Sequence, residues 1–219
     1  MDWQAIQLSL QLALATTVVL LLMGAPLAYW LSSRRSVLAT IIESVVASPL
    51  VIPPTVLGLV ILLAIGPRGP VGRAYESITG GTLPFSFAAL LMASLLFSLP
   101  FAVQPMVAAF SSVDRRLIDA SRCLGAGSMK TFLQVVLPLS IPGICAGAVL
   151  TFAHTMGEFG VVLMVGGGIP GKTRTASVSI YDAVQSMEYE RALRTSLFLV
   201  SISVMALIVT AVLRRRATL

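Results

Sequence analysis

Five long apolar runs dominate this sequence and decide what it can fold into. They cover residues 6–31, 39–65, 85–110, 139–164 and 195–213. An α-helix needs about 20 apolar residues to cross the hydrocarbon core of a membrane. Only 11% of the 219 residues are charged, against roughly 25% in soluble domains. The sequence therefore predicts an all-α integral membrane protein, a single domain over residues 1–219 with five or six membrane-spanning helices.

Proline interrupts two of these runs. The second run contains Pro49, Pro53 and Pro54, and the third contains Pro100 and Pro105 on either side of a glutamine. Each proline removes a backbone donor and disfavours a straight helix. Such breaks are tolerated at membrane depth where they are buried in protein or line a cavity. Two interpretations of the second run stay open, a kinked packing helix and a segment that lines a pathway.

The distribution of Lys and Arg predicts the orientation. Segments 32–38, 111–137 and 214–219 alternate with the opposite set of connections and carry nine of the 15 basic residues. Cytoplasmic loops are enriched in Lys and Arg. The pattern therefore predicts an N-terminus outside and a C-terminus in the cytoplasm. The first run is expected to be a retained helix, because it is too long for a signal peptide and no basic residue precedes Arg34.

The polar loop at about 111–137 is predicted to form two helices joined by a glycine turn. Ser111 and Asp114 form an N-terminal capping pattern, so a short helix is expected to begin near Val113. Gly125 suits the left-handed conformation with which helices often end. Ser128 can cap a second helix that leads into the fourth apolar run.

This loop resembles the EAA loop of ABC-importer permeases. The stretch DASRCLGAGSMKTFLQVVLP, residues 119–138, matches the pattern Glu-Ala-Ala, three residues, Gly, nine residues, Ile, one residue, Leu-Pro. It departs from the pattern at Asp119, Ser121 and Val135, each a close chemical neighbour of the family residue. The alternative is an ordinary basic cytoplasmic loop.

The resemblance implies the permease fold of type I ABC importers, with a cytoplasmic coupling helix that docks on a separate ATPase subunit. The residues implied in coupling are Asp119, Ala120, Ser121, Arg122, Leu124, Gly125 and Ala126. It also implies a homodimer, an external binding protein that delivers the substrate, and a bacterial or archaeal inner membrane. No metal, cofactor or nucleic acid is expected to bind this chain, and ATP is expected in the partner subunit.

Further segments are similar to the molybdate-transporter branch of that family. They are GEFG at 157–160, IPGKTRT at 169–175, SIYDAVQ at 179–185 and SPLVIPPTVLG at 48–58. The resemblance implies an oxyanion substrate, molybdate or tungstate, with sulfate or thiosulfate as the alternative. An alternative of another class is an ion-coupled secondary transporter, which would be expected to show internal repeats; none is clear here.

Residues 166–173, GGGIPGKT, match the phosphate-binding P-loop pattern. That loop needs a strand before it and a helix after it, whereas here an apolar membrane run leads in. The predicted orientation also places it in an external polar segment, about 166–194, away from ATP. A membrane-bound P-loop enzyme is therefore disfavoured, and the chain is predicted not to be an enzyme. Within this segment, residues 176–186 are expected to form a helix on the outer face.

Glu158 is an acidic residue at the outer end of the fourth run, where a carboxylate is costly. His154 lies one helical turn earlier, on the same face, and can pair with it. The alternative is an interfacial acid held by local hydrogen bonds. Five residues are candidates for a gate or for a structural role within the membrane: His154, Glu158, Pro53, Pro54 and Gln104.

Overall fold

The computed structural model describes residues 1–34 and 36–217, so Arg35 lies outside the described residues. Among the described residues, four helices are long and apolar enough to cross a membrane, and a bent pair adds a fifth if it is counted as one span. The spans are α1 (Trp3–Ser33), the pair α2 (Val37–Ala47) and α3 (Pro54–Ile65), α5 (Phe87–Ser111), the stretch Ser128–Gly157 that ends in α8, and α11 (Tyr189–Ala217). The predicted helical membrane protein is confirmed.

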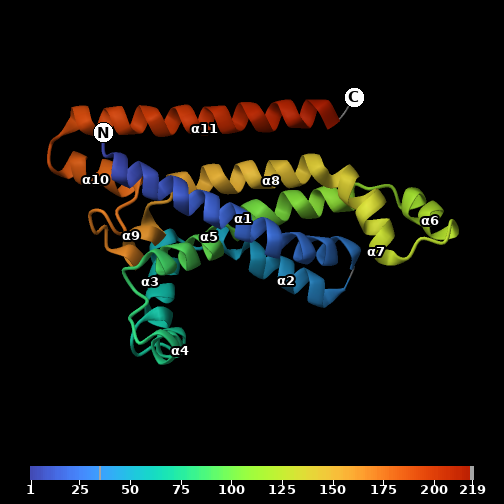
Figure 1. Cartoon of the computed structure of the whole chain (residues 1–219), viewed down its shortest axis with the longest axis horizontal. Coiled ribbons are helices and arrows are strands. Elements are labelled where there is room, and N and C mark those ends of the chain that lie inside the picture. The colour runs from blue at the N-terminus through green and yellow to red at the C-terminus, as the bar shows by residue number, and fades with distance from the viewer. Residues whose placement is uncertain (35, 218–219) are drawn as a thin grey trace.

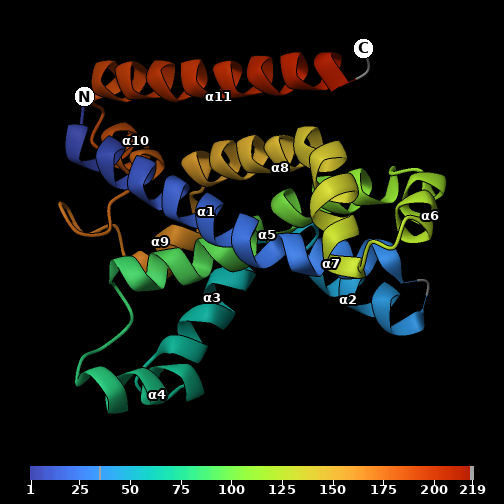
Figure 2. The same cartoon turned by 45° about the vertical axis from the view of Figure 1, so that its right-hand side comes forward.

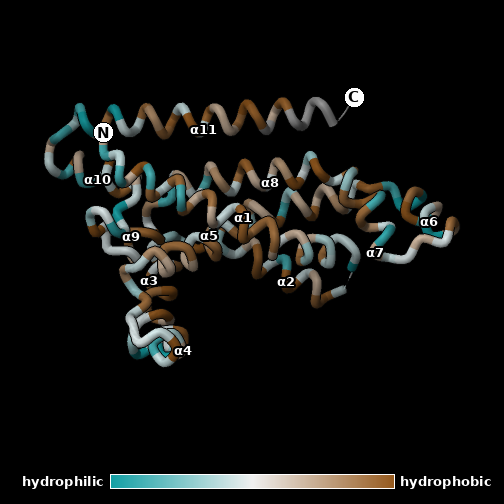
Figure 3. The backbone as a smooth tube through the Cα atoms, viewed as in Figure 1, coloured by the Kyte–Doolittle hydropathy of each residue, from teal (hydrophilic) through white to brown (hydrophobic). Residues whose placement is uncertain are grey.

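The long helices lie side by side, with α5 packed between α1 and α8 (Figures 1 and 2). Helix α11 forms an outer layer that contacts α8 and the short helix α10 (Ala176–Gln185). Figure 3 shows hydrophobic residues along most of these helices and hydrophilic residues gathered towards their ends. Helix α5 is the most buried of the four single spans and α11 the least. Helix α5 is therefore the central element of the monomer.

The second apolar run is a broken span. Helix α2 passes into a short 3-10 turn, η1 (Ser48–Leu50), and α3 then leaves at an angle of 109°. Pro53 occupies the N-cap position of α3 in an extended conformation, and Pro54 is its first residue. A proline at that position costs nothing, because the first N–H of a helix has no partner within it. The prolines therefore end one helix and begin another, rather than kinking a continuous one.

Helix α3 packs closely against α9 (Gly160–Gly166) through glycines. A Cβ on Gly58 would lie 2.8 Å from the Cβ of Met164, and one on Gly160 would lie 3.0 Å from the Cβ of Pro54. Both distances are too short for a larger side chain without movement. Ile61 and Val161 are buried in the same cluster. The two short helices therefore form one packed unit at the end of the molecule that holds the N-terminus (Figure 1).

The fourth span differs from its predicted bounds. Helix α7 (Ser128–Thr131), a π-helical segment η2 (Phe132–Val136) and α8 (Leu137–Gly157) run on as one apolar stretch. Its proline-containing start does not end the helix, because Pro138 lies in the first turn of α8. The outer part of the predicted run is the separate helix α9. The break falls at residues 158–159, where Glu158 leaves the helical conformation.

Two of the connecting segments contain a helix, of which one was predicted from the sequence and the other was not. The Gly- and Pro-rich segment 66–84, expected to be irregular, contains the ten-residue helix α4 (Pro70–Thr79). Its proline is at the first position and Gly80 ends it in a left-handed conformation, so the residues read as helix breakers are its two ends. The helix expected over 176–186 is confirmed as α10. Helix α11 begins six residues before the predicted fifth run, and Arg191 and Arg194 form ion pairs on its first turns.

Candidate functional site

The coupling-helix candidate lies at one tip of the molecule as α6 (Arg115–Cys123) (Figure 1). The Asp114 side chain accepts a hydrogen bond of 2.9 Å from the Arg116 N–H and caps the helix. The helix therefore begins two residues later than Val113, with Asp114 itself as the cap in place of Ser111. No residue of α6 is buried. Such exposure is suited to contact with a partner.

The turn after α6 depends on Gly125. Its φ of +81° lies in the left-handed region, with open space around its Cβ position. The Gly125 N–H donates to the Arg122 carbonyl, and the Ala126 N–H donates to the Ser121 carbonyl. The Ser121 and Thr131 hydroxyls are 3.1 Å apart and hydrogen-bonded. The glycine turn thus folds α6 back beside α7, as the sequence predicts.

The predicted coupling residues share one surface at this tip. Ser121 and Ala126 are half-buried. The other predicted coupling residues are exposed: Asp119, Ala120, Arg122, Leu124 and Gly125. Behind them, Ile118 packs against the core cluster that contains Phe110. Phe132 packs against Tyr29 of α1 at a ring distance of 4.7 Å. Movement of α6 would therefore reach the spans through these contacts.

A second cluster surrounds Glu158, whose side chain is 1% exposed. Ser94 and Ser98, one turn apart on α5, donate hydrogen bonds to its two carboxylate oxygens at 2.6 and 2.7 Å. Ser177 of α10 donates to the Glu158 backbone carbonyl. A buried carboxylate is tolerated only with such partners. Glu158 therefore joins the break between α8 and α9 to both α5 and α10.

His154 completes this cluster. Its Nδ1 atom lies 3.5 Å from Oε1 of Glu158 and 3.0 Å from Oγ of Ser98. Its ring stacks on Phe101 at a centroid distance of 3.9 Å, with Phe97 at 4.9 Å. The structure thus brings together the two residues that the sequence pairs. Ser98 bridges them, because 3.5 Å is long for a direct hydrogen bond.

The other three gate candidates lie elsewhere. Pro53 and Pro54 are exposed at the elbow between η1 and α3. Gln104 is exposed on α5, three residues after Phe101. Among the described residues, no hydrogen bond joins Gln104 to the Glu158 cluster.

The P-loop-like segment has its own internal structure. Helix α9 leads into it, and the N–H groups of Lys172, Thr173 and Arg174 all donate to the carbonyl of Ile169. The Thr173 hydroxyl donates to the Gly166 carbonyl and accepts from the Ile169 N–H. A P-loop holds phosphate with free backbone N–H groups and with its Ser/Thr hydroxyl on Mg²⁺. Here those amides and that hydroxyl are used within the turn.

The sequence did not predict the residues that contact Glu158 from other helices, or the role of Asp2. Ser94 and Ser98 could have been noticed as an i, i+4 polar pair within an apolar span. Asp2, at the start of α1, had no such signal. It caps α1 through Ala5 N–H and forms an ion pair of 2.7 Å with Arg174. Its partners Ser179 and Arg191 lie on α10 and α11.

This environment lowers the pKa of Asp2. Burial alone would raise the pKa, but the hydrogen bonds from Ala5 and Ser179 and the charges of Arg174 and Arg191 outweigh burial and place the pKa below its usual value. The Asp2 carboxylate is therefore ionised at neutral pH and joins the start of α1 to α10 and α11.

Comparison with known proteins agrees with this architecture. Residues 8–218 match the family described as binding-protein-dependent transport system inner membrane component. The chain is 52% identical over 191 residues to the molybdenum transport system permease protein ModB of Azotobacter vinelandii, covering 87% of this chain and 84% of that protein. It is 34% identical over 215 residues to the protein of the same name from Escherichia coli strain K12, covering 98% and 94%.

Solved structures show the same fold. A bacterial ABC transporter that imports alginate matches with a TM-score of 0.74 and 18% identity, covering 98% of this chain and 78% of that chain. The MetNI methionine ABC transporter in an inward-facing conformation matches with a TM-score of 0.73 and 17% identity, covering 99% and 96%. The fold expected from the coupling-loop resemblance, that of an ABC-importer permease, is confirmed. The chain therefore belongs to the family of binding-protein-dependent transport system inner membrane components.

Proposed function

We propose that this chain is the membrane-spanning permease subunit of an ATP-driven importer that carries an oxyanion, molybdate or tungstate, into the cytoplasm. The observation that carries the proposal is the identity of 52% and 34%, over most of both chains, to two proteins named as molybdenum permeases. The segments GEFG, IPGKTRT and SIYDAVQ support it from the sequence. The exposed helix α6 provides the surface that such a subunit needs for contact with its ATPase.

The ATPase partner is proposed to dock on α6 and the turn that follows it. Two large apolar side chains stand out there: Leu124 is 88% exposed and Met129 is 70% exposed. Leu124 lies between α6 and α7, outside the candidate spans, so lipid does not account for its exposure, and Met129 lies at the very start of the span Ser128–Gly157. Apolar side chains exposed to water in this way mark interaction surfaces. In the assembled importer, closure of the ATPase subunits would move α6 and, through Ile118 and Phe132, the spans.

ATP is proposed to bind the partner and not this chain. The Ile169, Lys172 and Thr173 amides of the GGGIPGKT segment, residues 166–173, are used within its own turn. We expect Lys172→Ala to leave ATP hydrolysis by the assembled complex within about twofold of wild type, because a P-loop lysine that contacts phosphate is indispensable for hydrolysis. Steady-state ATPase activity of the purified complex checks this. Abolished hydrolysis in a normally assembled complex would return the segment to consideration as a nucleotide site.

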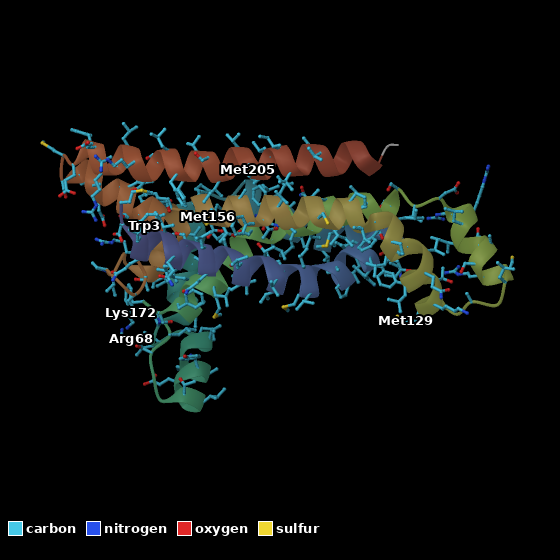
Figure 4. All side chains as sticks on the ribbon, turned by 45° about the horizontal axis from the view of Figure 1, so that its top comes forward. Trp3, Arg68, Met129, Met156, Lys172 and Met205 are labelled. Carbon is cyan, nitrogen blue, oxygen red and sulfur yellow. The ribbon has the colours of Figure 1, made fainter. Side chains whose placement is uncertain are left out.

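The orientation and the other partners complete the proposal. The C-terminal ends of α1 and α11 lie on the same side of the molecule as α6 (Figure 1). Figure 4 shows Lys172 and Arg68 at the end opposite Met129. This arrangement supports an N-terminus outside and a C-terminus in the cytoplasm. A second copy of this chain would form the pathway at a two-fold axis, and an external binding protein would deliver the anion.

Reconstitution tests the substrate assignment. The permease, its ATPase and its binding protein are combined in proteoliposomes, and anion-stimulated ATP hydrolysis is measured with molybdate, tungstate, sulfate and thiosulfate. We expect molybdate and tungstate to stimulate hydrolysis and labelled molybdate to accumulate. Stimulation by sulfate or thiosulfate alone would assign the chain to a related oxyanion. Uptake that needs an ion gradient and no ATPase would contradict the proposal as a whole.

A further inference from the structure

His154 has a distinctive position in the charge distribution of this chain. It is the single histidine of the sequence. Apart from it, helices α1, α2, α3, α5, α8 and α9 contain no side chain that can carry a positive charge. A dianion that crosses a region of low dielectric is costly unless hydrogen-bond donors or positive charge accompany it. Within these helices, only His154 can supply both.

The hydrogen bonds around His154 favour one tautomer of its ring. Glu158 accepts the Ser94 and Ser98 protons at 2.6 and 2.7 Å, lengths typical of a hydroxyl that donates to an ionised carboxylate. Ser98 has one proton, and it is used in that bond. The contact of 3.0 Å between Ser98 Oγ and His154 Nδ1 is therefore a hydrogen bond when Nδ1 carries the proton, and the Thr155 hydroxyl, 2.9 Å from Ser98 Oγ, can also donate to it. Nε2 is the second ring nitrogen and lies outside these bonds.

That second nitrogen has no hydrogen-bond partner in the part of the chain that the structure describes. Among the described residues no group forms a hydrogen bond with Nε2, and the His154 side chain is 21% exposed while Glu158 behind it is 1% exposed. The carboxylate is thus hidden from an approaching anion, yet close enough to balance an imidazolium. Phe101 stacks on the ring at 3.9 Å and stabilises the same cation through its face.

The elements packed against α8 differ in charge. Helix α5 and η2 carry no titratable side chain, α1 carries only Tyr29, and α8 carries only Cys145 besides His154. Helix α10 carries Tyr181 and Asp182, and α11 carries Tyr189, Glu190, Arg191 and Arg194 at its start and three arginines at its end. Among the described residues, Glu158 is the charged group that forms an ion pair with the ring. The partly buried Phe97, at 4.9 Å from the ring, also packs against the cluster formed by α3 and α9. His154 therefore sits beside the broken-helix unit at the end that holds Lys172.

A second polar group lies along the same helix face. Gln104 follows Phe101 by three residues on α5, is exposed, and forms no hydrogen bond with any described residue. A polar side chain at membrane depth is expected to face other helices or water rather than lipid. The amide group of Gln104 is a hydrogen-bond donor suited to an oxyanion.

We propose that His154 contacts the oxyanion as it passes through the membrane, donating a hydrogen bond from Nε2 once that nitrogen has taken a proton from water, with Gln104 as a second donor. Ser98 and Glu158 are positioning residues, which hold the ring through Nδ1 and balance its charge. This rests on the proposed function as an oxyanion permease. It assigns the place in this chain where a dianion meets a compensating charge.

Nitrogen NMR tests the chemistry directly, because one histidine gives one imidazole signal. The permease is labelled with ¹⁵N-histidine, carries a purification tag without histidine, and is assembled with unlabelled ATPase and binding protein in lipid. We expect a protonated Nδ1 and a bare Nε2 without anion, and protonation of Nε2 when molybdate is added. Sodium chloride at equal ionic strength is the control. A spectrum unchanged at molybdate concentrations that stimulate the ATPase would overturn the proposal, as would a bare Nδ1.

Transport tests the consequence. We expect His154→Leu, which removes both ring nitrogens, to lower the initial rate of molybdate uptake at least about tenfold, the loss expected for one hydrogen bond to a charged group, with normal membrane abundance and complex assembly. Cys145→Ala, on the same helix, should transport as wild type. Glu158→Gln should lower uptake and also shift the ¹⁵N signals of His154, because it replaces the carboxylate that lies 3.5 Å from Nδ1.

The outcomes separate the two proposals. If wild type carries no molybdate, the proposed function fails. If wild type carries molybdate and His154→Leu carries it equally well, the proposed function stands and the role of His154 is wrong.

Discussion

Single residues in this protein act mainly by joining helices that are distant in sequence. Glu158 reaches α5 and α10, and Asp2 reaches α10 and α11. Neither connection can be predicted from local patterns, because each depends on which helices become neighbours. Asp2 itself precedes the first membrane span, so pH can probe it.

We expect Asp2→Asn to lower the thermal unfolding temperature at neutral pH. Loss of a charged hydrogen-bond partner costs about 1.5–3 kcal/mol, which is about 3–12 °C for a protein of this size. Because the pKa of Asp2 is lowered in the folded protein, its contribution is complete above the unfolded pKa of about 4 and is lost as pH falls through the folded value. The unfolding temperature of Asp2→Asn should therefore fall less on acidification than that of wild type.

Asp182→Asn is the matched control. Its carboxylate contacts the same Arg174 at 3.9 Å, but its side chain is 47% exposed, and exposed ion pairs contribute little. Equal destabilisation by the two variants, measured by differential scanning fluorimetry, would show that burial of Asp2 is not the cause.

Among the elements, those whose sequence carried several consistent signals were predicted well. Helix α10 and the glycine turn after α6 follow their predicted positions. Helix α4 was missed because its terminal proline and glycine were taken as signs of an irregular loop. The break between α8 and α9 was missed because both parts are apolar. The burial of the carboxylate that marks this break depends on α5, and no single run reveals it.

The turn after α6 gives a prediction about how one element, the helix α6, is positioned. Gly125→Val should lose uptake while the subunit stays at normal abundance in the membrane. A β-branched residue is strongly disfavoured at the φ of +81°, at a cost of about 1–2 kcal/mol or more, so the turn would re-aim α6. Uptake and ATPase activity of the reconstituted complex are the measurements, and we expect at least about a tenfold loss of coupled uptake if that cost falls on the docked state.

Gly127→Val provides the control two residues away. Its φ of −68° suits any residue, and the space around its Cβ position is also open. This variant should transport nearly as wild type. If Gly125→Val also transported normally, the loop would be a basic connector without a coupling role.

For the whole molecule, the arrangement of charged segments predicts which parts of the chain face the cytoplasm. Labelling of a native cysteine can test this orientation. Cys123 is exposed on α6. In a Cys145→Ser background we expect an impermeant maleimide to leave Cys123 unlabelled on intact cells and to label it in inverted vesicles. With both native cysteines replaced by serine, Lys172→Cys should show the reverse pattern. Labelling of Cys123 from outside would invert the topology and remove the basis for docking an ATPase on α6.

The π-helical segment η2 also bears on which insertions and deletions the chain tolerates. The Leu137 N–H bonds to the Phe132 carbonyl, five residues back, so this turn holds one residue more than an α-helical turn would. Deletion of the exposed Gln134 can therefore convert η2 to regular α-helix and leave both flanking helices in phase. The same deletion at Leu150, within regular α8, would rotate all that follows by about 100° and carry Glu158 away from Ser94. We expect membrane abundance and uptake to survive the first deletion and to be lost with the second, so this short turn is where the length of the chain can change by one residue.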